Sequence, residues 1–150
     1  MSVKIEVERP VRPDVAALLR ESRAMMAGLY PPESCHGLDL GAYARPEVTL
    51  FVAREAGVAL GCGAFQLHGD GSAEVKSMFV AESARGRGVG RAILEAIEAA
   101  LAGRVGSLRL ETGVRQLAAI RLYEAAGFAR RGPFGSYTDD PLSVFMEKSL

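Results

Sequence analysis

The chain of 150 residues is 49% hydrophobic and 24% charged, a composition that suits a folded protein with a buried core and excludes a disordered one. Its 18 basic and 18 acidic residues give a formal net charge of zero, which argues against nucleic acid or an anionic membrane as the main partner. At this length we expect one domain over residues 1–150.

The hydrophobic pattern predicts the elements that follow, in chain order. A strand at 3–8 and a helix at 14–27 come first, and the irregular stretch at 28–46 holds a short helix near 38–44. Strands at 49–54, 58–67 and 73–80 are joined by turns at 55–57 and 68–72. The second half of the chain alternates between helices and strands. We expect a helix at 89–101, a strand at 107–112, a helix at 116–126, a strand from Phe128, a loop at 132–141 and a strand at 142–148. The two tight turns predict antiparallel pairing in the first half of the sheet.

The start of the chain and its two cysteines indicate a compartment. The first residues, Met-Ser-Val-Lys-Ile-Glu, alternate like a strand and lack the apolar run of a signal peptide, and no apolar stretch reaches transmembrane length. Cys62 lies in an apolar strand pattern between two glycines, so a buried free thiol is expected there rather than a disulfide with Cys35. We therefore expect a cytoplasmic protein.

Residues 85–90 read Arg-Gly-Arg-Gly-Val-Gly and join the strand at 73–80 to the helix at 89–101. Glycines let the backbone approach a ligand closely, and free N–H groups with partial positive charge point outward at a helix start. Arginine binds phosphate through two parallel hydrogen bonds, and three arginines crowd this turn. The segment therefore predicts a site for a phosphorylated ligand.

Three phosphate-binding patterns compete for this turn. The P-loop string Gly-x-x-x-x-Gly-Lys-Ser/Thr does not occur in the chain. The Rossmann string Gly-x-Gly-x-x-Gly meets Arg91 at its sixth position; Glu111 stands at the distance of a ribose ligand, but a Rossmann fingerprint belongs in a leading βαβ unit. The third pattern, Arg/Gln-x-x-Gly-x-Gly/Ala, matches Arg85, Gly88 and Gly90, and it resembles the pyrophosphate-binding turn of the GNAT superfamily of N-acetyltransferases.

A second string, Ala-x-x-Leu-Tyr-x-x-x-Gly-Phe at 119–128, resembles the second GNAT signature and stands at the usual distance from the first. One departure is visible, because many members have Asn where this chain has Gln116, whose longer side chain can make the same kinds of hydrogen bond. The resemblance covers residues 48–128 well. It implies an α/β (α+β) fold with a mixed, mostly antiparallel central sheet flanked by helices. It also implies an N-acetyltransferase that uses acetyl-coenzyme A as cosubstrate and a primary amine of a small molecule or peptide as acceptor.

In the family, the strand before the turn, the turn itself and the amide before the second helix hold the coenzyme. The residues that the resemblance assigns to this role are Met78, Phe79, Val80, Arg85, Gly86, Arg87, Gly88, Val89, Gly90, Arg91 and Gln116. A non-catalytic sensor of acyl-coenzyme A would keep the same turn, and it stays open as an alternative that needs neither a base nor an acid.

The transfer needs a base, because alkyl amines titrate near the lysine value of about 10.4 and are protonated at pH 7. Glu74 stands six residues before Val80, where several GNAT enzymes keep their base; its structural alternative is a pair with Lys76 on the same strand face. Tyr123 stands where the family often has a tyrosine that points at the coenzyme sulfur and would stabilise the departing thiolate. Packing against the sheet is the structural alternative for Tyr123.

Two segments are candidates for the acceptor site, since GNAT acceptor sites often use the early helical region and the last loop. The first segment offers Tyr30 and His36, and the second offers Tyr137 with Asp139 or Asp140, whose carboxylates would attract an ammonium group. Ordinary turn formation also explains both segments. No His or Cys spacing fits a zinc site, so no metal is expected. The acceptor, the acyl chain and the oligomeric state, including a homodimer, stay open.

Overall fold

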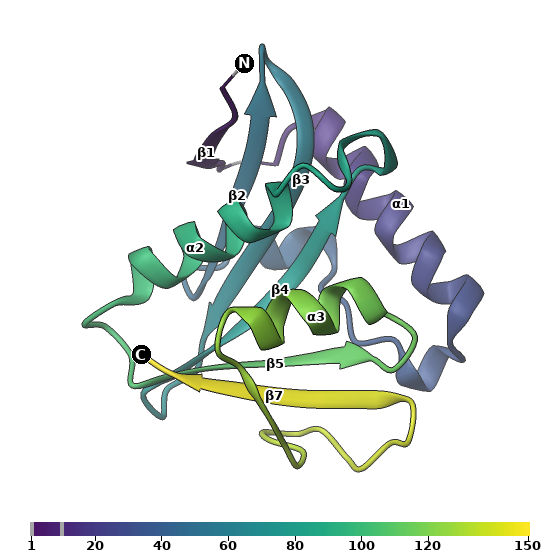
Figure 1. Ribbon diagram of the computed structural model, residues 1–150, viewed down its shortest axis with the longest axis vertical. Coiled ribbons are helices and arrows are strands. Elements are labelled where there is room, and N and C mark those ends of the chain that lie inside the picture. Colours follow the sequence, from purple (N-terminus) through teal and green to yellow (C-terminus); the bar gives the residue numbers. More distant parts are fainter. Residues whose placement is uncertain (1, 10) are drawn as a thin grey trace.

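The computed structural model describes residues 2–9 and 11–150, and in this part of the chain seven strands form one sheet (Figure 1). The strand order is β1-β2-β3-β4-β5-β7-β6, and every neighbouring pair is antiparallel except the parallel pair β4 and β5. The strands are β1 (Lys4–Val7), β2 (Val48–Glu55), β3 (Val58–Leu67), β4 (Ser72–Val80), β5 (Ser107–Gly113), β6 (Ala129–Arg131) and β7 (Ser143–Ser149). The predicted mixed, mostly antiparallel sheet is confirmed, and the Rossmann alternative, which requires parallel strands throughout, is excluded.

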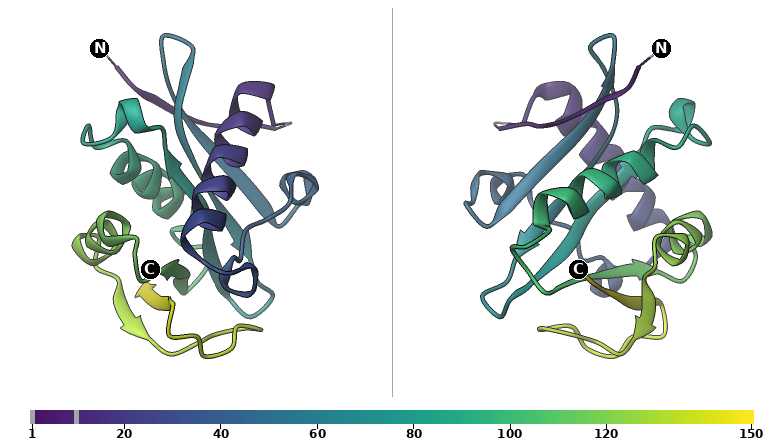
Figure 2. Two further views of the ribbon diagram at one scale, coloured as in Figure 1. Left: turned by 90° about the vertical axis from the view of Figure 1, so that its right-hand side faces the viewer. Right: turned by 60° about the vertical axis from the view of Figure 1, so that its left-hand side comes forward.

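Helices cover both faces of the sheet. Helix α1 (Pro13–Leu29) lies on one face, and α2 (Val89–Leu101) and α3 (Leu117–Ala125) lie on the other (Figure 2). Each face has its own apolar core, one around α1 and one around α2 and α3. Three short 3-10 helices complete the structure: η1 (Pro32–Ser34), η2 (Leu40–Ala44) and η3 (Glu82–Ala84). Within residues 2–9 and 11–150, no helix combines the length and the apolar character needed to cross a membrane.

The element boundaries agree closely with the sequence pattern. Helix α2 begins and ends at the predicted residues, because its buried residues Val89, Ile93, Ile97 and Leu101 repeat every four positions and form one continuous face. The short helix expected near 38–44 is the 3-10 helix η2, which is shorter than predicted. Cys62 is buried and free, as expected, and burial raises the pKa of its thiol to about 12.

The feature of the sheet that matters for function is the separation of β4 from β5. The two strands pair only over Ser72–Glu74 and Ser107–Arg109, and beyond this point they diverge, as Figure 1 shows. We call the space between residues 75–80 of β4 and residues 110–113 of β5 the strand opening. Because the parallel ladder stops, backbone groups on the facing edges lack strand partners there and are available to a ligand.

A bulge bends β4 within the strand opening. Ser77 has a φ of 61°, a left-handed conformation that is rare for a residue with a side chain. The register of β3 against β4 shifts at the same place, opposite Gly63. A Cβ atom at Gly63 would lie 2.4 Å from the sulfur of Met78 and 2.7 Å from a methyl carbon of Ile93, so only glycine lets α2 and β4 pack this closely. The Tyr43 hydroxyl and Ser77 Oγ lie 2.6 Å apart and tie the bulge to η2.

Candidate active site

The glycine-rich turn has the shape that phosphate binding requires. Gly86 and Gly88 have φ values of 77° and 79°, which a residue with a side chain rarely adopts. Gly88 is the N-cap of α2 and no side chain caps the helix, whose first bond runs from the Ala92 N–H to the Gly88 carbonyl at 3.1 Å. The N–H groups of the first helical turn therefore remain free, and they face an exposed surface where an anion can bind.

The three arginines of the turn have partners within the chain. Arg87 pairs with Glu55 at 2.8 Å, and Arg91 pairs with Glu95 at 3.1 Å. The pair of Arg91 and Glu95 is exposed, and such a pair is worth about 0–1 kcal/mol, so a phosphate can replace the carboxylate of Glu95 at little loss. Arg87 is itself half-exposed, although the side chain of Glu55 is largely covered. Arg85 donates to the Val80 carbonyl at 3.1 Å and lies over the ring of a neighbouring phenylalanine.

The strand and helix next to the turn approach each other closely. A Cβ atom at Gly90 would lie 3.4 Å from Leu122 and 3.6 Å from Val80, which places the start of α2 against both α3 and β4. Met78 and Val80 pack against the core on the side of α2, so their side chains are fixed while their backbone groups border the strand opening. The predicted coenzyme-binding residues of β4 and of the turn are thus brought together at one end of the opening.

Glu74 lies at the inner end of the strand opening, where β4 and β5 part, and is only 3% exposed. Its Oε1 lies 3.0 Å from Nε2 of His68. Its Oε2 accepts hydrogen bonds from the hydroxyl of Tyr137 at 2.5 Å and from Nζ of Lys76 at 3.3 Å. The pair of Glu74 with Lys76 on one strand face is therefore present. Three donors surround the carboxylate of Glu74, and as a base Glu74 would have to take a proton in their presence.

Tyr137 and His36 lie side by side next to Glu74. Their rings meet edge to face, with centroids 5.1 Å apart, and Lys76 Nζ donates both to the His36 carbonyl at 2.9 Å and to the Tyr137 hydroxyl at 3.1 Å. Burial and the charge of Glu74 raise the pKa of Tyr137 above its ordinary value, so this phenol stays protonated and acts as a donor. The two predicted acceptor segments therefore meet at one wall of the opening.

The aspartates of the last loop have different environments. Asp140 accepts from the Ser34 hydroxyl at 2.6 Å and from the Leu142 N–H at 2.9 Å, and these hydrogen bonds hold the pKa of Asp140 below its usual value. It therefore ties the last loop to η1. Asp139 is exposed, and its carboxylate makes no hydrogen bond within the described part of the chain, so it is the carboxylate of this loop that a cation can reach.

Tyr30 lies apart from this wall, at the junction of β5 and α3. It is 6% exposed, it donates to Oε1 of Gln116, and it accepts from the Arg115 N–H at 3.0 Å. Both hydrogen-bonding capacities of its hydroxyl are used, so the structure gives Tyr30 a packing role, and its contact with the acceptor stays a prediction. Gln116 has its carbonyl oxygen occupied by Tyr30 and keeps its N–H groups for another partner.

Tyr123 belongs to the core on the opposite face of the sheet. It is 5% exposed, and its ring lies edge-on to Phe128 at 5.8 Å. Burial, and then the charge of Glu111, raise the pKa of Tyr123 above its ordinary value. No described group bonds to its hydroxyl, and no fully buried side-chain oxygen or nitrogen in the described residues lacks a partner, so this oxygen must border an accessible space. A protonated phenol with a free donor is what the predicted acid requires.

A comparison with protein families decides the identity of the fold. Residues 16–128 match the family model described as the acetyltransferase (GNAT) family. The chain belongs to this family. Like other GNAT proteins it is an acetyltransferase that takes its acyl group from an acyl-coenzyme A, and the alternative of a non-catalytic sensor is not supported by its relatives, which are named as acetyltransferases.

Relatives of this GNAT protein span its whole length. It is 48% identical to an IAA acetyltransferase from Azospirillum brasilense over 99% of each chain. It is 38% identical to YsnE of Bacillus subtilis, an uncharacterized N-acetyltransferase, over 91% of this chain and 92% of the relative. A crystal structure from Klebsiella pneumoniae, assigned to the acyl-coenzyme A N-acyltransferases, has a TM-score of 0.83 and 35% identity and covers 99% of this chain and 97% of that chain.

A coenzyme complex is found among the more distant GNAT structures. The PaiA N-acetyltransferase from Thermoplasma acidophilum, solved with coenzyme A, has a TM-score of 0.74 and 16% identity over the full length of both chains. This likeness shows that the two proteins share a fold. In the GNAT chain described here, residues 2–9 and 11–150 contain no cluster of three or more His, Cys, Asp or Glu side chains arranged for a metal ion.

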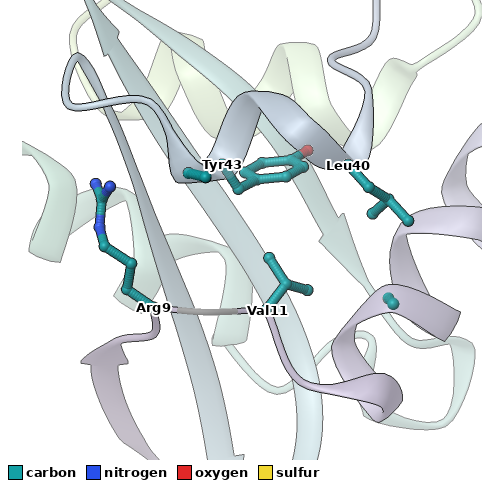
Figure 3. Close-up of a pocket in the computed structure, with 6 residues that line it drawn as sticks. Arg9, Val11, Leu40 and Tyr43 are labelled. Atoms are coloured by element: carbon teal, nitrogen blue, oxygen red, sulfur yellow. The ribbon is translucent and has the colours of Figure 1, made fainter.

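A hollow of about 500 Å³ lies away from the GNAT motifs, between the start of α1 and η2 (Figure 3). Its lining is formed by Arg9, Val11, Ala16, Leu40, Tyr43 and Ala44. None of these residues belongs to the phosphate-binding turn or to the strand opening. We place the active site at the strand opening, because the chemistry-bearing side chains converge there rather than at the hollow.

Three side chains enter the site with roles that the sequence did not predict. Lys76 was expected only as a structural partner of Glu74, Glu111 only as a ribose ligand of a Rossmann unit, and His68 had no assigned role. Lys76 and His68 surround Glu74, and Glu111 of β5 faces the same wall, with Ser143 Oγ donating to its Oε2 at 2.8 Å. Because side chains alternate along a strand, Glu111 lies on the same face as Arg109. This alternation could have indicated from the sequence that Glu111 belongs to a polar face of the strand at 107–112. The neighbouring strands were not deducible, because β4 and β5 are separated in the chain by all of α2.

Proposed function

We propose that residues 1–150 form one acetyltransferase domain that transfers an acetyl group from acetyl-coenzyme A to a primary amine of a small molecule or peptide. The observation that carries this proposal is the strand opening. A phosphate-binding turn lies at one end, and carboxylates and phenols line the space where the strands diverge. An amine needs a base and a thiolate needs a proton donor, and the opening offers both.

The turn and the edge of β4 fit the coenzyme. The pyrophosphate of the coenzyme would be bound by the turn, which offers exposed left-handed glycines, uncapped N–H groups and arginines that can exchange their partners. The amide-bearing arm of the coenzyme would pair with the unpaired backbone edge at Met78 and Val80. Gln116, whose N–H groups point away from its bond with Tyr30, is a further donor. When bound, the coenzyme supplies an activated acetyl thioester.

The side chains of the opening would perform direct transfer. A carboxylate takes the proton of the incoming ammonium group, and Glu74 is the candidate that the sequence predicts for this step. Tyr123 donates a hydrogen bond to the sulfur as the thiolate departs, which stabilises the developing charge. Nothing in this scheme requires a covalent acyl-enzyme.

The acceptor would enter along the wall formed by Tyr137 and His36. Tyr137 presents an aromatic face, and Asp139 offers an exposed carboxylate that attracts a cationic amine. The relative named as an IAA acetyltransferase makes IAA one compound to include among the acceptors tested.

The test is a screen for release of free thiol from acetyl-coenzyme A with amines, amino acids and peptides. We expect release with at least one amine and a binding constant for acetyl-coenzyme A that weakens as salt rises, because arginines meet phosphates. Gly88→Asp should abolish coenzyme binding, since its carboxylate would repel the phosphate. The matched control is Gly88→Asn, which has the same shape and the same backbone requirement but no charge. Equal binding by both folded variants would refute the phosphate site.

A further inference from the structure

We propose that Glu111 is the general base that takes the proton of the acceptor amine, and that Glu74 positions the acceptor wall. This inference rests on the proposed function and deepens it.

Glu111 stands on β5 beyond the last residue that pairs with β4. Glu74 pairs in register with Arg109, and Glu111 lies two residues further, so all three side chains are on one face of the sheet. On its other side Glu111 is opposite Phe145 of β7, whose ring packs on Tyr137 at 5.4 Å. Glu111 is therefore the carboxylate that projects from the diverging part of β5, toward the wall where the acceptor would enter.

One oxygen of Glu111 is free. Ser143 donates to Oε2, and no described group donates to Oε1. Since no fully buried side-chain oxygen in residues 2–9 and 11–150 lacks a partner, Oε1 must border an accessible space. Glu74 differs, because His68, Lys76 and Tyr137 occupy both of its oxygens. An ammonium group can reach the partnerless oxygen of Glu111, whereas Glu74 is 3% exposed and already accepts from three donors, which leaves little room for a fourth.

Titratable and hydrogen-bonding groups from several elements around the strand opening act on Glu111. Burial raises the pKa of Glu111 above its ordinary value, while the bond from Ser143 lowers it. His36 and Lys76 lower the pKa of Glu111, and Glu74 raises it. The charge of Glu111 also acts on both phenols, Tyr137 on one face and Tyr123 on the other. Glu111 therefore lies within electrostatic reach of the predicted acid as well as of the acceptor wall.

The proton balance of the step is as follows. The ammonium group gives one proton to Glu111, which later releases it to water. The neutral nitrogen forms the bond to the acetyl carbon as the carbon–sulfur bond breaks. Tyr123 gives its proton to the departing thiolate, and the excess proton of the new amide nitrogen restores the Tyr123 hydroxyl. The products are the N-acetylated amine, free coenzyme thiol and one proton in solution.

The test compares Glu111→Gln with Glu74→Gln in the thiol-release assay from pH 6 to 10. We expect Glu111→Gln to lower kcat/KM on the order of 100-fold at neutral pH. The limb of the profile that reports the base should disappear, and acetyl-coenzyme A affinity should be unchanged. Because burial disfavours the charged form of Glu111, the variant should also be at least as heat-stable as the parent. A merely structural carboxylate would show the reverse, with a lower melting temperature.

Ser143→Ala is the second variant and keeps Glu111 in place. Without the hydroxyl donor the pKa of Glu111 rises, so the base limb should move to higher pH while the maximum rate stays close to that of the parent. A parent-like profile for Glu111→Gln together with a lost limb for Glu74→Gln would overturn this inference and leave the proposed function standing. A parent that releases thiol with no amine would overturn both.

Discussion

Gly113 at the end of β5 provides a sharp test of how the site is held together. A Cβ atom built there would lie 2.0 Å from the Tyr30 hydroxyl oxygen and 2.2 Å from the ring carbon that bears it. The oxygen must then move by more than about 1 Å to restore ordinary contact. Tyr30 is buried and its hydroxyl bonds to Gln116 and to the Arg115 N–H, so this movement breaks both hydrogen bonds.

The expected loss follows from these contacts. Two hydrogen bonds contribute about 0.5–1.5 kcal/mol each, and overpacking adds about 1–3 kcal/mol. We therefore expect Gly113→Ala to lower the free energy of unfolding by roughly 3 kcal/mol, which for a chain of this size lowers Tm by about 6–12 °C. The affinity for acetyl-coenzyme A should fall as well, because Gln116 loses the partner that orients its amide.

The assay is urea denaturation of four proteins: the parent, Gly113→Ala, Tyr30→Ala and the double variant. With the tyrosine ring removed there is room for the methyl group, so Gly113→Ala should change stability by under about 1 kcal/mol in the Tyr30→Ala background. Gly106→Ala, at the other end of β5, is the control, since the nearest neighbour of its Cβ atom would lie at 3.9 Å. An equal loss for Gly113→Ala in both backgrounds would refute the clash with Tyr30.

Two further predictions concern catalysis and the acceptor. Tyr123→Phe should lower kcat by about 10-fold to 100-fold with little change in coenzyme affinity, because only the donor to the sulfur is removed; a parent-like kcat in steady-state kinetics would make Tyr123 a packing residue. Tyr137→Ala combined with Asp139→Asn should raise the KM for the amine by about 10-fold and leave the KM for acetyl-coenzyme A unchanged; identical amine saturation curves would show that the last loop is only a turn.

The sequence predicted most of the fold and the phosphate turn because both are local. The apolar residues at every fourth position predict helix α2. Gly86 and Gly88 permit the left-handed backbone conformation that the turn adopts. The mixed, mostly antiparallel character of the sheet was predicted from the family resemblance and from the hairpin turns, whereas the pairing of β4 with β5 was not predicted. Buried free Cys62 was predictable for the same local reason, since it lies within an apolar strand pattern.

The surroundings of the candidate residues could not be predicted, because they depend on contacts between distant segments. Glu74 and Tyr137 are 63 positions apart, and Tyr30 and Gln116 are 86 positions apart. Nothing in the sequence indicates that Tyr30 uses both of its hydrogen-bonding capacities at the β5–α3 junction. From the sequence, Glu111 was considered only as a ribose ligand of a Rossmann unit. Its place in the site depends on where β4 and β5 diverge, which the sequence does not show.

Several features that disfavour folding gather at the strand opening. The parallel ladder stops after three residue pairs, which leaves edge groups of β4 without strand partners. Ser77 holds a left-handed conformation that costs about 1–3 kcal/mol. Glu74 is buried and Glu111 is half-buried, and both burial and the charge of Glu74 raise the pKa of Glu111.

Each of these unfavourable features is one that a ligand would relieve. An amide-bearing arm would pair with the open edge of β4, and an ammonium group would compensate the charge of Glu111. Every fully buried polar side-chain atom of the described residues already has a partner, so the groups that a ligand would satisfy are backbone edges and partly exposed side chains. The strain at Ser77 and the unpaired edge groups of β4, at the place where the motifs converge, have a simple explanation if substrate binding completes them. On this reasoning acetyl-coenzyme A and the amine should each raise Tm, and together they should raise it more than either does alone.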